Sequence, residues 1–439
     1  MNTTFKKSGK VWALFIGCCV MSAVGFSIAT TTFSLFVTPI SESMGIPTAS
    51  VFLYYTTESV GVIIATALTP QILKKAGAGK TVAIAAAVGA LGLAGIAAFA
   101  SPVTIPLFAF IIGLALPLNS LIAVGIFVNN WFLEKTGFFT GLAFACSGIG
   151  GAILSAVASL IIQSFGWQFA LYVLAAIMFL AIAPFGIFVI RLSPLPLGIL
   201  PYGATEEKMA EMAAADTDDG VKGATAAVVL PGLTFKEARR SSAFFILVGA
   251  FLLFGVVGAL NTNVATLVRS GGYAITLAGL AVSIASIGNL LGKILMGWVK
   301  DHKGGVAASA VGIALTAVGL VLYIVSIFIQ SVILVYIAAF IGGMGSCLIT
   351  ILPPLLTGET FGRKDFAQIF GIASVFVSVG SMIATPIFGA IFDTTKSYLA
   401  NCVIMLVVAV LSFPLVIAAI KAGQSKWLQS TPPSKAGEE

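Results

Sequence analysis

The segment Gly288–Gly304, with the sequence GNLLGKILMGWVKDHKG, joins the end of a long apolar run to a short polar cluster. The run covers residues 274–299 and contains one charged residue, Lys293. Because a helix needs about 20 apolar residues to cross a bilayer, the run predicts a membrane-spanning helix. The polar cluster at 300–303 predicts a loop after it.

The whole chain repeats this pattern of apolar runs and short polar loops. Of its 439 residues, 59% are hydrophobic and 9% are charged, whereas about 25% of an ordinary soluble chain is charged. The composition therefore excludes a soluble enzyme, a disordered chain and a nucleic-acid binder. It also excludes an outer-membrane barrel, whose strands would alternate polar and apolar residues. We expect an all-α membrane protein that is not an enzyme.

The five cysteines all lie inside apolar runs and lack C-x-x-C spacing. This placement is typical of buried small hydrophobic residues and predicts neither a disulfide framework nor a metal site. The sequence carries no metal-ligand cluster, nucleotide-binding loop or catalytic triad. We expect no cofactor and no bound metal.

Turn residues divide the apolar sequence into twelve predicted membrane spans. The first span follows three lysines but is too long for the apolar core of a cleaved signal peptide, so we expect it to remain as a helix. The spans lie near 11–38, 48–72, 80–100, 104–130, 137–163, 168–191, 242–268, 274–299, 306–328, 331–356, 367–391 and 397–420.

Basic residues fall almost entirely on one side of these spans. If the N-terminus is cytoplasmic, twenty Lys and Arg lie in cytoplasmic segments, whereas two, Arg269 and Lys396, lie on the opposite side. Short loops that are rich in Lys and Arg stay in the cytoplasm. We therefore expect both termini in the cytoplasm and a multi-pass protein of the cytoplasmic (inner) cell membrane.

A polar, acidic segment divides the spans into two sets of six. Its content of Ala, Gly and Pro indicates a solvated linker. We expect an N-terminal half at 1–192, a cytoplasmic linker at 193–240, a C-terminal half at 241–421 and a cytoplasmic tail at 422–439.

The two halves repeat some of their glycines at a nearly constant offset. Gly77 and Gly304, each in the loop after the second span of its half, are 227 residues apart. Gly141 and Gly371, each in the fifth span of its half, are 230 residues apart. Two six-span repeats are typical of a transporter whose substrate site lies between the halves, near the membrane midplane.

Several motifs resemble those of the major facilitator superfamily. Its cytoplasmic signature places a glycine, an acid, a basic residue and a second glycine at the positions of Gly297, Asp301, His302 and Gly304. Further pieces resemble the monocarboxylate-transporter and oxalate/formate-antiporter branch: NWFLEKTG at 130–137, GWQFA at 166–170, LGILPYG at 197–203, TFKEARRS at 234–241 and FGRKD at 361–365. The resemblance covers nearly the whole chain and implies twelve transmembrane helices in two six-helix halves.

The resemblance also implies that Gly297, Asp301, His302 and Gly304 form a conformational latch between cytoplasmic helix ends. An acid and cations at helix ends can hold neighbouring helix termini together in one access state. His302 replaces the usual Arg or Lys of the family. The first half departs from the pattern, because Lys74 stands where the acid belongs.

Glu58 is one of two charged residues well inside the predicted spans, where a charge costs roughly 2.5–3.5 kcal/mol on insertion scales. It follows Pro47 by eleven residues, which places it roughly 16 Å along the second span and near the midplane. Tyr54 shares its helix face. Two interpretations remain open: a carboxylate that binds and releases a proton during transport, and a protonated side chain that bonds a neighbouring helix.

Lys293 is the second intramembrane charge and lies about 9 Å inside the predicted end of the eighth span. Its position relative to Asp301 matches an arginine that, by the resemblance, holds a substrate carboxylate, and Asn289 lies one turn earlier. Lysine keeps the charge but lacks the bidentate geometry of arginine. Alternatively, its long side chain reaches the lipid headgroups. The family's second basic residue, in span eleven, has no counterpart, which favours a monoanion over a dianion such as oxalate.

Uncharged polar residues gather in spans one, four and seven, which line the central cavity in this superfamily. Among them, Thr31, Asn119, Asn261 and Asn263 are candidate substrate contacts. The hydroxyls of the run 30–32 also suit hydrogen bonds to their own helix backbone.

Closely spaced glycines recur in spans eight and ten. Gly288 and Gly292 are one turn apart, and Gly342, Gly343 and Gly345 form a similar group. Small residues let membrane helices approach closely, so these spacings predict helix packing and not ligand binding.

Together these observations predict a secondary transporter that moves a small organic anion, of the monocarboxylate type, by alternating access. Coupling would be proton symport or anion exchange. Two alternatives share the fold: an exporter of drugs or metabolites, and a membrane sensor that binds a ligand without transporting it. The short linker, with no folded output domain, disfavours the sensor. We expect a small anion, protons and the lipid bilayer as partners, no nucleic acid, and a monomer.

The topology predicts that a cysteine at position 212, in the linker, is inaccessible from outside the cell. In a background without the native cysteines, Met212→Cys should fail to react with a membrane-impermeant maleimide, and Lys396→Cys should react. Ready labelling at position 212 in intact cells would contradict the predicted orientation.

Overall fold

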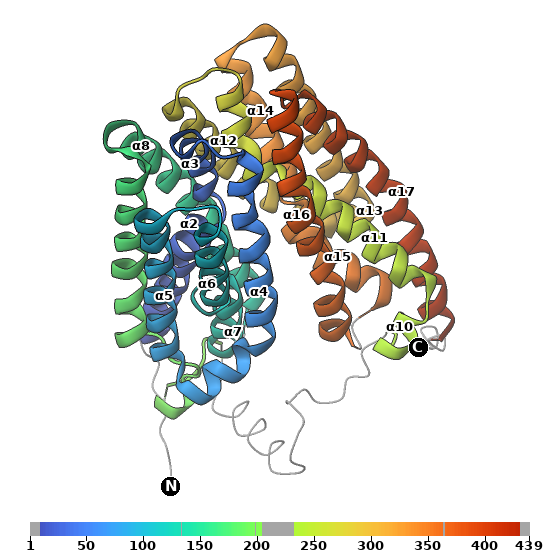
Figure 1. Cartoon of the computed structure of the whole chain (residues 1–439). Coiled ribbons are helices and arrows are strands. Elements are labelled where there is room, and N and C mark those ends of the chain that lie inside the picture. The colour runs from blue at the N-terminus through green and yellow to red at the C-terminus, as the bar shows by residue number, and fades with distance from the viewer. Residues whose placement is uncertain (1–8, 133, 198, 204–231, 363–364, 431–439) are drawn as a thin grey trace, which may run out of the picture.

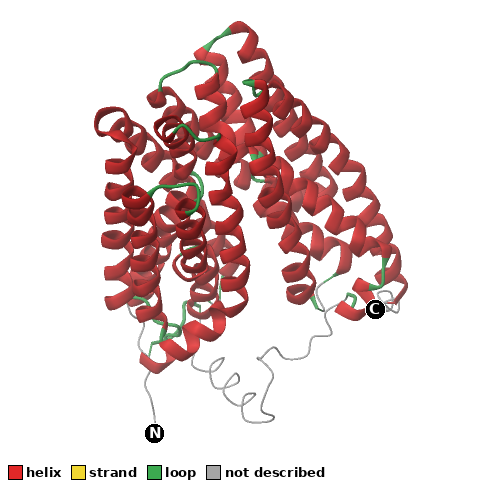
Figure 2. Cartoon of the chain, viewed as in Figure 1, coloured by secondary structure: helices red, strands yellow, loops and turns green. Residues whose placement is uncertain are grey.

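A computed structural model describes residues 9–132, 134–197, 199–203, 232–362 and 365–430. Most of the predicted linker, residues 204–231, lies outside this range. In the described residues the chain forms helices joined by short loops (Figure 2). The helices run α1 Lys10–Val20, α2 Ser27–Ala29, α3 Val37–Met44, α4 Thr48–Ala76, α5 Ala78–Phe99, α6 Thr104–Asn119, α7 Leu121–Trp131, α8 Thr136–Phe188, α10 Phe235–Arg239, α11 Ser242–Gly258, α12 Leu260–Ser270, α13 Ile275–Ile329, α14 Val332–Gly345, α15 Leu348–Phe361, α16 Phe366–Thr395 and α17 Leu399–Ser430.

The helices form eleven apolar segments that are long enough to cross a membrane, counted over the described residues. The segment Phe138–Phe188 contains 51 residues and breaks at Gly166, whose φ of 85° is reserved in practice for glycine. It therefore supplies two crossings, and the predicted total of twelve is confirmed. Gly304, with φ of 82°, makes the corresponding turn inside α13.

Spans one, four, seven and ten are interrupted near their middle. Span one passes through a π-helical turn at Met21–Phe26 and a 3₁₀ turn at Thr32–Phe36. Span four breaks between α6 and α7 at Ser120, three residues after a proline. Span seven breaks at Ala259 and span ten at 346–347. Such breaks free backbone groups, which membrane proteins tolerate where the backbone is buried in protein or lines a cavity.

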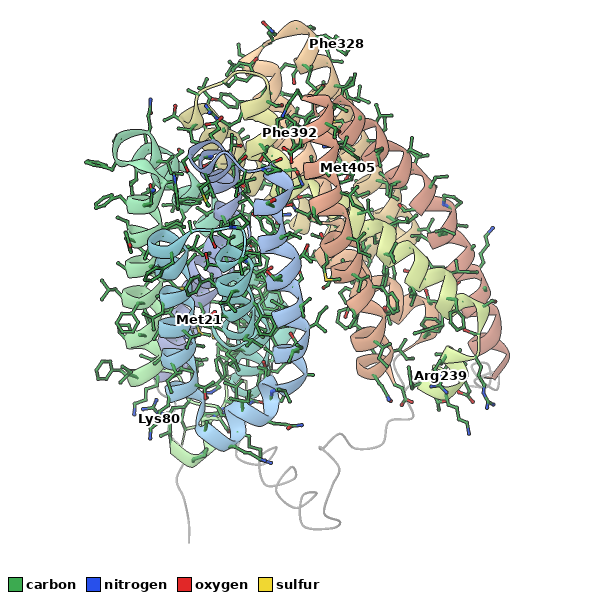
Figure 3. The ribbon with its side chains drawn as sticks, in the orientation of Figure 1. Met21, Lys80, Arg239, Phe328, Phe392 and Met405 are labelled. Atoms are coloured by element: carbon green, nitrogen blue, oxygen red, sulfur yellow. The ribbon has the colours of Figure 1, made fainter. Side chains whose placement is uncertain are left out.

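The two halves of the chain form two groups of helices (Figure 1). α1 to α8 make up one group, and α11 to α17 make up the other. The groups meet at the end far from the first residue of α1 and the last residue of α17, here called the distal end, and diverge toward the opposite end, here called the terminal end. α4 packs on α16 and α8 packs on α13, so these pairs join the halves. Lys80 and Arg239, two of the residues counted as cytoplasmic, lie at the terminal end (Figure 3).

The described ends of the predicted linker dock onto equivalent helices of the two halves. Tyr202 N–H donates to the carbonyl of Trp131 at the end of span four, at 2.8 Å. Leu233 N–H donates to the carbonyl of Phe361 at the end of span ten, also at 2.8 Å. At the C-terminus, α17 extends to Ser430, so part of the predicted tail continues the last helix.

The predicted close packing of glycines between spans eight and ten is confirmed. A Cβ atom added at Gly288 would overlap the carbonyl of Phe340, and one at Gly292 would overlap that of Met344. In the reverse direction, a Cβ at Gly343 would overlap the backbone of Ala285. The two helices therefore touch backbone to backbone.

This contact predicts that Gly343→Ala destabilises the protein, because one backbone must shift to admit the methyl group. Overpacking of this kind costs about 1–3 kcal/mol. Gly371→Ala is the matched control, because a Cβ there has no neighbour within 4 Å. Thermal unfolding in detergent should show a lower Tm for Gly343→Ala and an unchanged or higher Tm for Gly371→Ala. Equal Tm values would contradict the described packing.

Candidate functional site

A cavity of about 190 Å³ lies between the two halves. Eight spans contribute to its wall: one, two, four and five from the first half, and seven, eight, ten and eleven from the second. All four interrupted spans are among them. The lining residues are Phe26, Thr30, Thr31, Tyr55, Glu58, Ser59, Leu121, Ser147, Gly148, Gly258, Asn261, Thr262, Ala285, Ser286, Asn289, Lys293, Ile349, Thr350, Ser381 and Thr385.

Glu58 lines the cavity from α4, ten residues after the first residue of that helix, or about 15 Å along it. The side chain is 5% exposed. α6 packs directly behind it, because a Cβ at Gly113 would overlap the Glu58 carbonyl. Within the described residues its carboxyl group has no hydrogen-bond partner, and the residue borders the cavity.

Lys293 lines the same cavity from α13, in the other half. Its Nζ lies 3.5 Å from the hydroxyl of Ser147 on α8, a contact at the long limit of a hydrogen bond. Among the described residues, no carboxylate lies within 4.0 Å of Nζ, and Glu58 is therefore farther away than an ion pair. The cavity thus holds one acid and one base that do not neutralise each other directly.

Three more of the predicted site residues lie in the cavity wall: Asn289, Asn261 and Thr31. Asn289 donates through Nδ2 to the hydroxyl of Ser346 at 2.9 Å, which fixes its amide beside the break in span ten. Within the described residues, the side chain of Asn261 makes no hydrogen bond with the protein. Its amide is free to meet a ligand.

Most hydroxyl groups around the cavity donate their proton to the backbone. Thr30 donates to Phe26 O at 2.6 Å, and Tyr55 donates to Thr30 O at 3.0 Å. Ser286 and Thr262 do the same within their own helices, at 2.9 Å each. These oxygens are left as acceptors. The donors that remain for a bound carboxylate are Lys293 Nζ, the Asn261 amide and the hydroxyls of Thr31, Ser59 and Ser381, which donate no hydrogen bond within the described residues.

Three predicted substrate contacts lie outside the cavity wall. Tyr54 is fully buried and donates to Ala29 O at 3.0 Å, and the neighbouring Tyr55 takes its place at the cavity. Asn263 donates through Nδ2 to Ala259 O at 2.7 Å and accepts through Oδ1 from the Tyr398 hydroxyl at 3.0 Å. Asn119 is 1% exposed at the end of α6. These three side chains are not among the residues that line the cavity.

Serine and threonine residues of spans five, eight, ten and eleven line the cavity although sequence analysis did not select them as site residues. Ser147, Ser286, Thr350 and Ser381 are examples. Hydroxyl residues are common in membrane helices, where they usually bond their own backbone. No signal in the sequence separates these four from the others.

The predicted latch residues lie in the middle of α13, where the helix bends at Gly304. His302 bonds the carbonyl of Trp298 on its own helix through Nδ1, at 2.8 Å, and stacks on the Trp298 ring. Within the part of the chain that the structure describes, no hydrogen bond or ion pair joins His302 to another helix, and its role in a latch stays a prediction. Gly304 makes the turn that follows, and Gly305 N–H donates to Glu359 Oε2 on α15 at 2.7 Å. The side chain of Asp301 lies outside the described residues.

The chain matches the sequence profile of the family described as Major Facilitator Superfamily over residues 119–305 and 246–436. These two matches together cover more than half of the chain. The chain belongs to the major facilitator superfamily. Members of this superfamily are transporters, and the cavity described above is the candidate substrate site of this chain.

The sequence of this facilitator is similar to that of a protein from the monocarboxylate-transporter branch, which its motifs resemble. Monocarboxylate transporter 12 of Rattus norvegicus is 25% identical over an alignment of 332 positions that covers 72% of this chain. The aligned region spans 64% of the length of that transporter.

Solved structures of other transporters share the fold of this facilitator. A mutant of the nucleoside transporter NupG has a TM-score of 0.71 at 14% identity and covers 92% of this chain and 99% of its own. A bacterial homologue of the human lysosomal transporter Spinster scores 0.68 at 11% identity, over 98% and 100%. A D-xylose–proton symporter scores 0.68 at 14% identity, over 95% and 99%. At these identities the likeness shows the fold alone.

The site geometry predicts that small carboxylates stabilise the purified protein and that Lys293 is required for this effect. A ligand at 100 times its Kd stabilises by about 2.7 kcal/mol. Lys293→Gln should abolish the rise in Tm, and Lys293→Arg should keep part of it because the charge remains. Lys303→Gln, at an exposed lysine just after the span that carries Lys293, is the control. An undiminished Tm rise in Lys293→Gln would show that Lys293 does not bind the carboxylate, and would favour the alternative in which its side chain extends to the lipid headgroups.

Proposed function

We propose that this protein is a secondary carrier that moves a small organic monoanion by alternating access, coupled to protons or to exchange of a second anion. One observation carries the proposal: Glu58 and Lys293, one from each half, face the same cavity without forming an ion pair. A buried charge is expensive unless something compensates it. A bound anion compensates Lys293, and a proton compensates Glu58.

The charge and size of the cavity limit the substrate. A single basic side chain, Lys293, lines it among the described residues, and α16 contributes Ser381 and Thr385 where a second base would be needed for a dianion. A volume of about 190 Å³ suits a molecule of a few carbon atoms. The acceptor oxygens of the wall favour a carboxylate that carries a donor group of its own, such as a hydroxyl.

In this mechanism the anion binds between the halves. Its carboxylate accepts from Lys293 Nζ, which already lies beside Ser147 of the opposite half. The anion therefore contacts both halves at once. It favours the conformation that is closed on both sides, which lies between the two conformations that are each open to one side of the membrane. Its negative charge also makes a proton on Glu58 more favourable, so anion and proton bind together.

The proposal includes the arrangement in the membrane. Residues 1–192 and 241–421 act as the two rocking halves, the linker 193–240 and both termini lie in the cytoplasm, and one chain suffices for transport. The predicted asymmetry of basic residues, twenty in cytoplasmic segments against two on the opposite side, supports this orientation. The terminal end is then the cytoplasmic end.

Counterflow separates the proposed carrier from a sensor. Proteoliposomes loaded with unlabelled carboxylate should accumulate the labelled compound transiently, because a carrier exchanges its ligand across the membrane. A sensor that binds without transport would show ligand-dependent Tm shifts and no counterflow.

We predict that Glu58→Gln abolishes the uptake that a pH gradient drives and leaves exchange largely intact. The amide keeps the shape of the side chain but cannot carry the proton. Uptake into proteoliposomes with an acidic exterior measures the first activity, and counterflow measures the second. Glu134→Gln, an exposed acid on the terminal side, is the control. Uphill uptake at the parent rate in Glu58→Gln would leave Glu58 a purely structural role.

A further inference from the structure

The distal ends of α4 and α16, one from each half, are joined by a single carboxylate. Asp393 Oδ1 accepts from Thr48 N–H at 3.1 Å and from the Thr48 hydroxyl at 2.7 Å. Its Oδ2 accepts from Ala49 N–H at 2.9 Å. Both donor residues belong to the first turn of α4, whose own N-cap residue, Pro47, offers no side-chain cap.

The position of Asp393 in its own helix shows that it serves the other half. It lies two residues before the end of α16 at Thr395. A negative charge is unfavourable at the C-terminal end of a helix and favourable at an N-terminal end. Asp393 is thus misplaced for α16 and well placed for α4, whose first N–H groups have no partner inside the helix.

The backbones of the two helices approach closely around this carboxylate. A Cβ at Gly389, one turn before Asp393, would lie 2.9 Å from Ala49 Cα. Two turns deeper along α4, the hydroxyl of Thr56 donates to Met382 O at 2.9 Å. Separation of the halves at the distal end must break these contacts together with those of Asp393.

The second charged contact between the halves at this end is weaker. Arg269 on α12 and Glu42 on α3 form an ion pair at 3.1 Å, and the Glu42 side chain is 60% exposed. Exposed ion pairs contribute little to stability because water screens them. Charge-assisted hydrogen bonds to backbone N–H groups are stronger. Asp393 therefore carries the larger share of the charged contacts at the distal end.

We propose that Asp393 is a positioning residue of the transport cycle, which caps α4 from the opposite half and so holds the distal side closed. Glu58 lies ten residues after Thr48 on the capped helix. Release of the cap lets α4 leave α16 and turns the side chain of Glu58 toward the distal side. This inference rests on the proposed alternating access. Its test uses no transported anion, so it can fail independently of the proposed substrate class.

Labelling of a cysteine in the cavity measures the open side directly. Thr262→Cys places a thiol in the wall, in a background without the native cysteines, and an impermeant maleimide is added from the distal side. Asp393→Ala should raise the labelling rate roughly tenfold, which corresponds to about 1.4 kcal/mol. Thr394→Ala is the control, because that hydroxyl bonds its own helix. An unchanged rate in Asp393→Ala overturns the proposal.

Labelling from the terminal side separates a shifted equilibrium from a loosened fold. In inside-out vesicles, Asp393→Ala should label more slowly than the parent, because the terminal side is closed more often. Faster labelling from both sides would mean general destabilisation and would overturn the proposal. Thr48→Val removes one partner of Asp393 and should shift both rates in the same directions by less. Added to Asp393→Ala, it should have little further effect, because the two residues share one contact.

Discussion

The architecture depends on the cost of holding two unpaired charges inside a membrane protein. Glu58 and Lys293 come from different halves, face one cavity and remain farther apart than an ion pair. If Glu58 and Lys293 formed a direct ion pair, each would neutralise the other and neither would need a further partner. Because they are separated, each side chain needs a partner that can bind and leave. A proton and an anion are the partners that fit, and in the proposed mechanism each is bound and released in every transport cycle. The buried charges are therefore the source of the proposed coupling.

The rest of the fold positions these two charges. Gly113 lets α6 pack against the backbone at Glu58, and the glycines of spans eight and ten fix the helix that carries Lys293. Four interrupted spans surround the cavity, where their freed backbone groups have polar surroundings. Asp393 and Thr48 join the halves at one end, so the two groups of helices diverge toward the other.

Properties that depend on local sequence could be predicted, and those that depend on the pairing of distant helices could not. The twelve spans follow from apolar length, and Glu58 and Lys293 stand out because a charge in an apolar run is rare. Tyr54 is a candidate from the sequence because it lies four residues before Glu58 and shares its helix face. The structure puts Tyr55 in the cavity wall, about 100° around the helix, and which face meets the cavity depends on the packing of distant helices. Asp393 carries one local signal, an acid at a helix C-terminus, but its partner lies 345 residues away.

Proton uptake upon anion binding tests the central claim most directly. Calorimetric titration of the purified protein with a small carboxylate, repeated in buffers of different ionisation enthalpy over a range of pH, gives the number of protons taken up with each anion. We predict that at one pH uptake approaches about one proton per anion in the parent, and that this uptake is absent in Glu58→Gln. Anion binding without proton uptake at every pH would contradict the claim that the two charges act through one cavity.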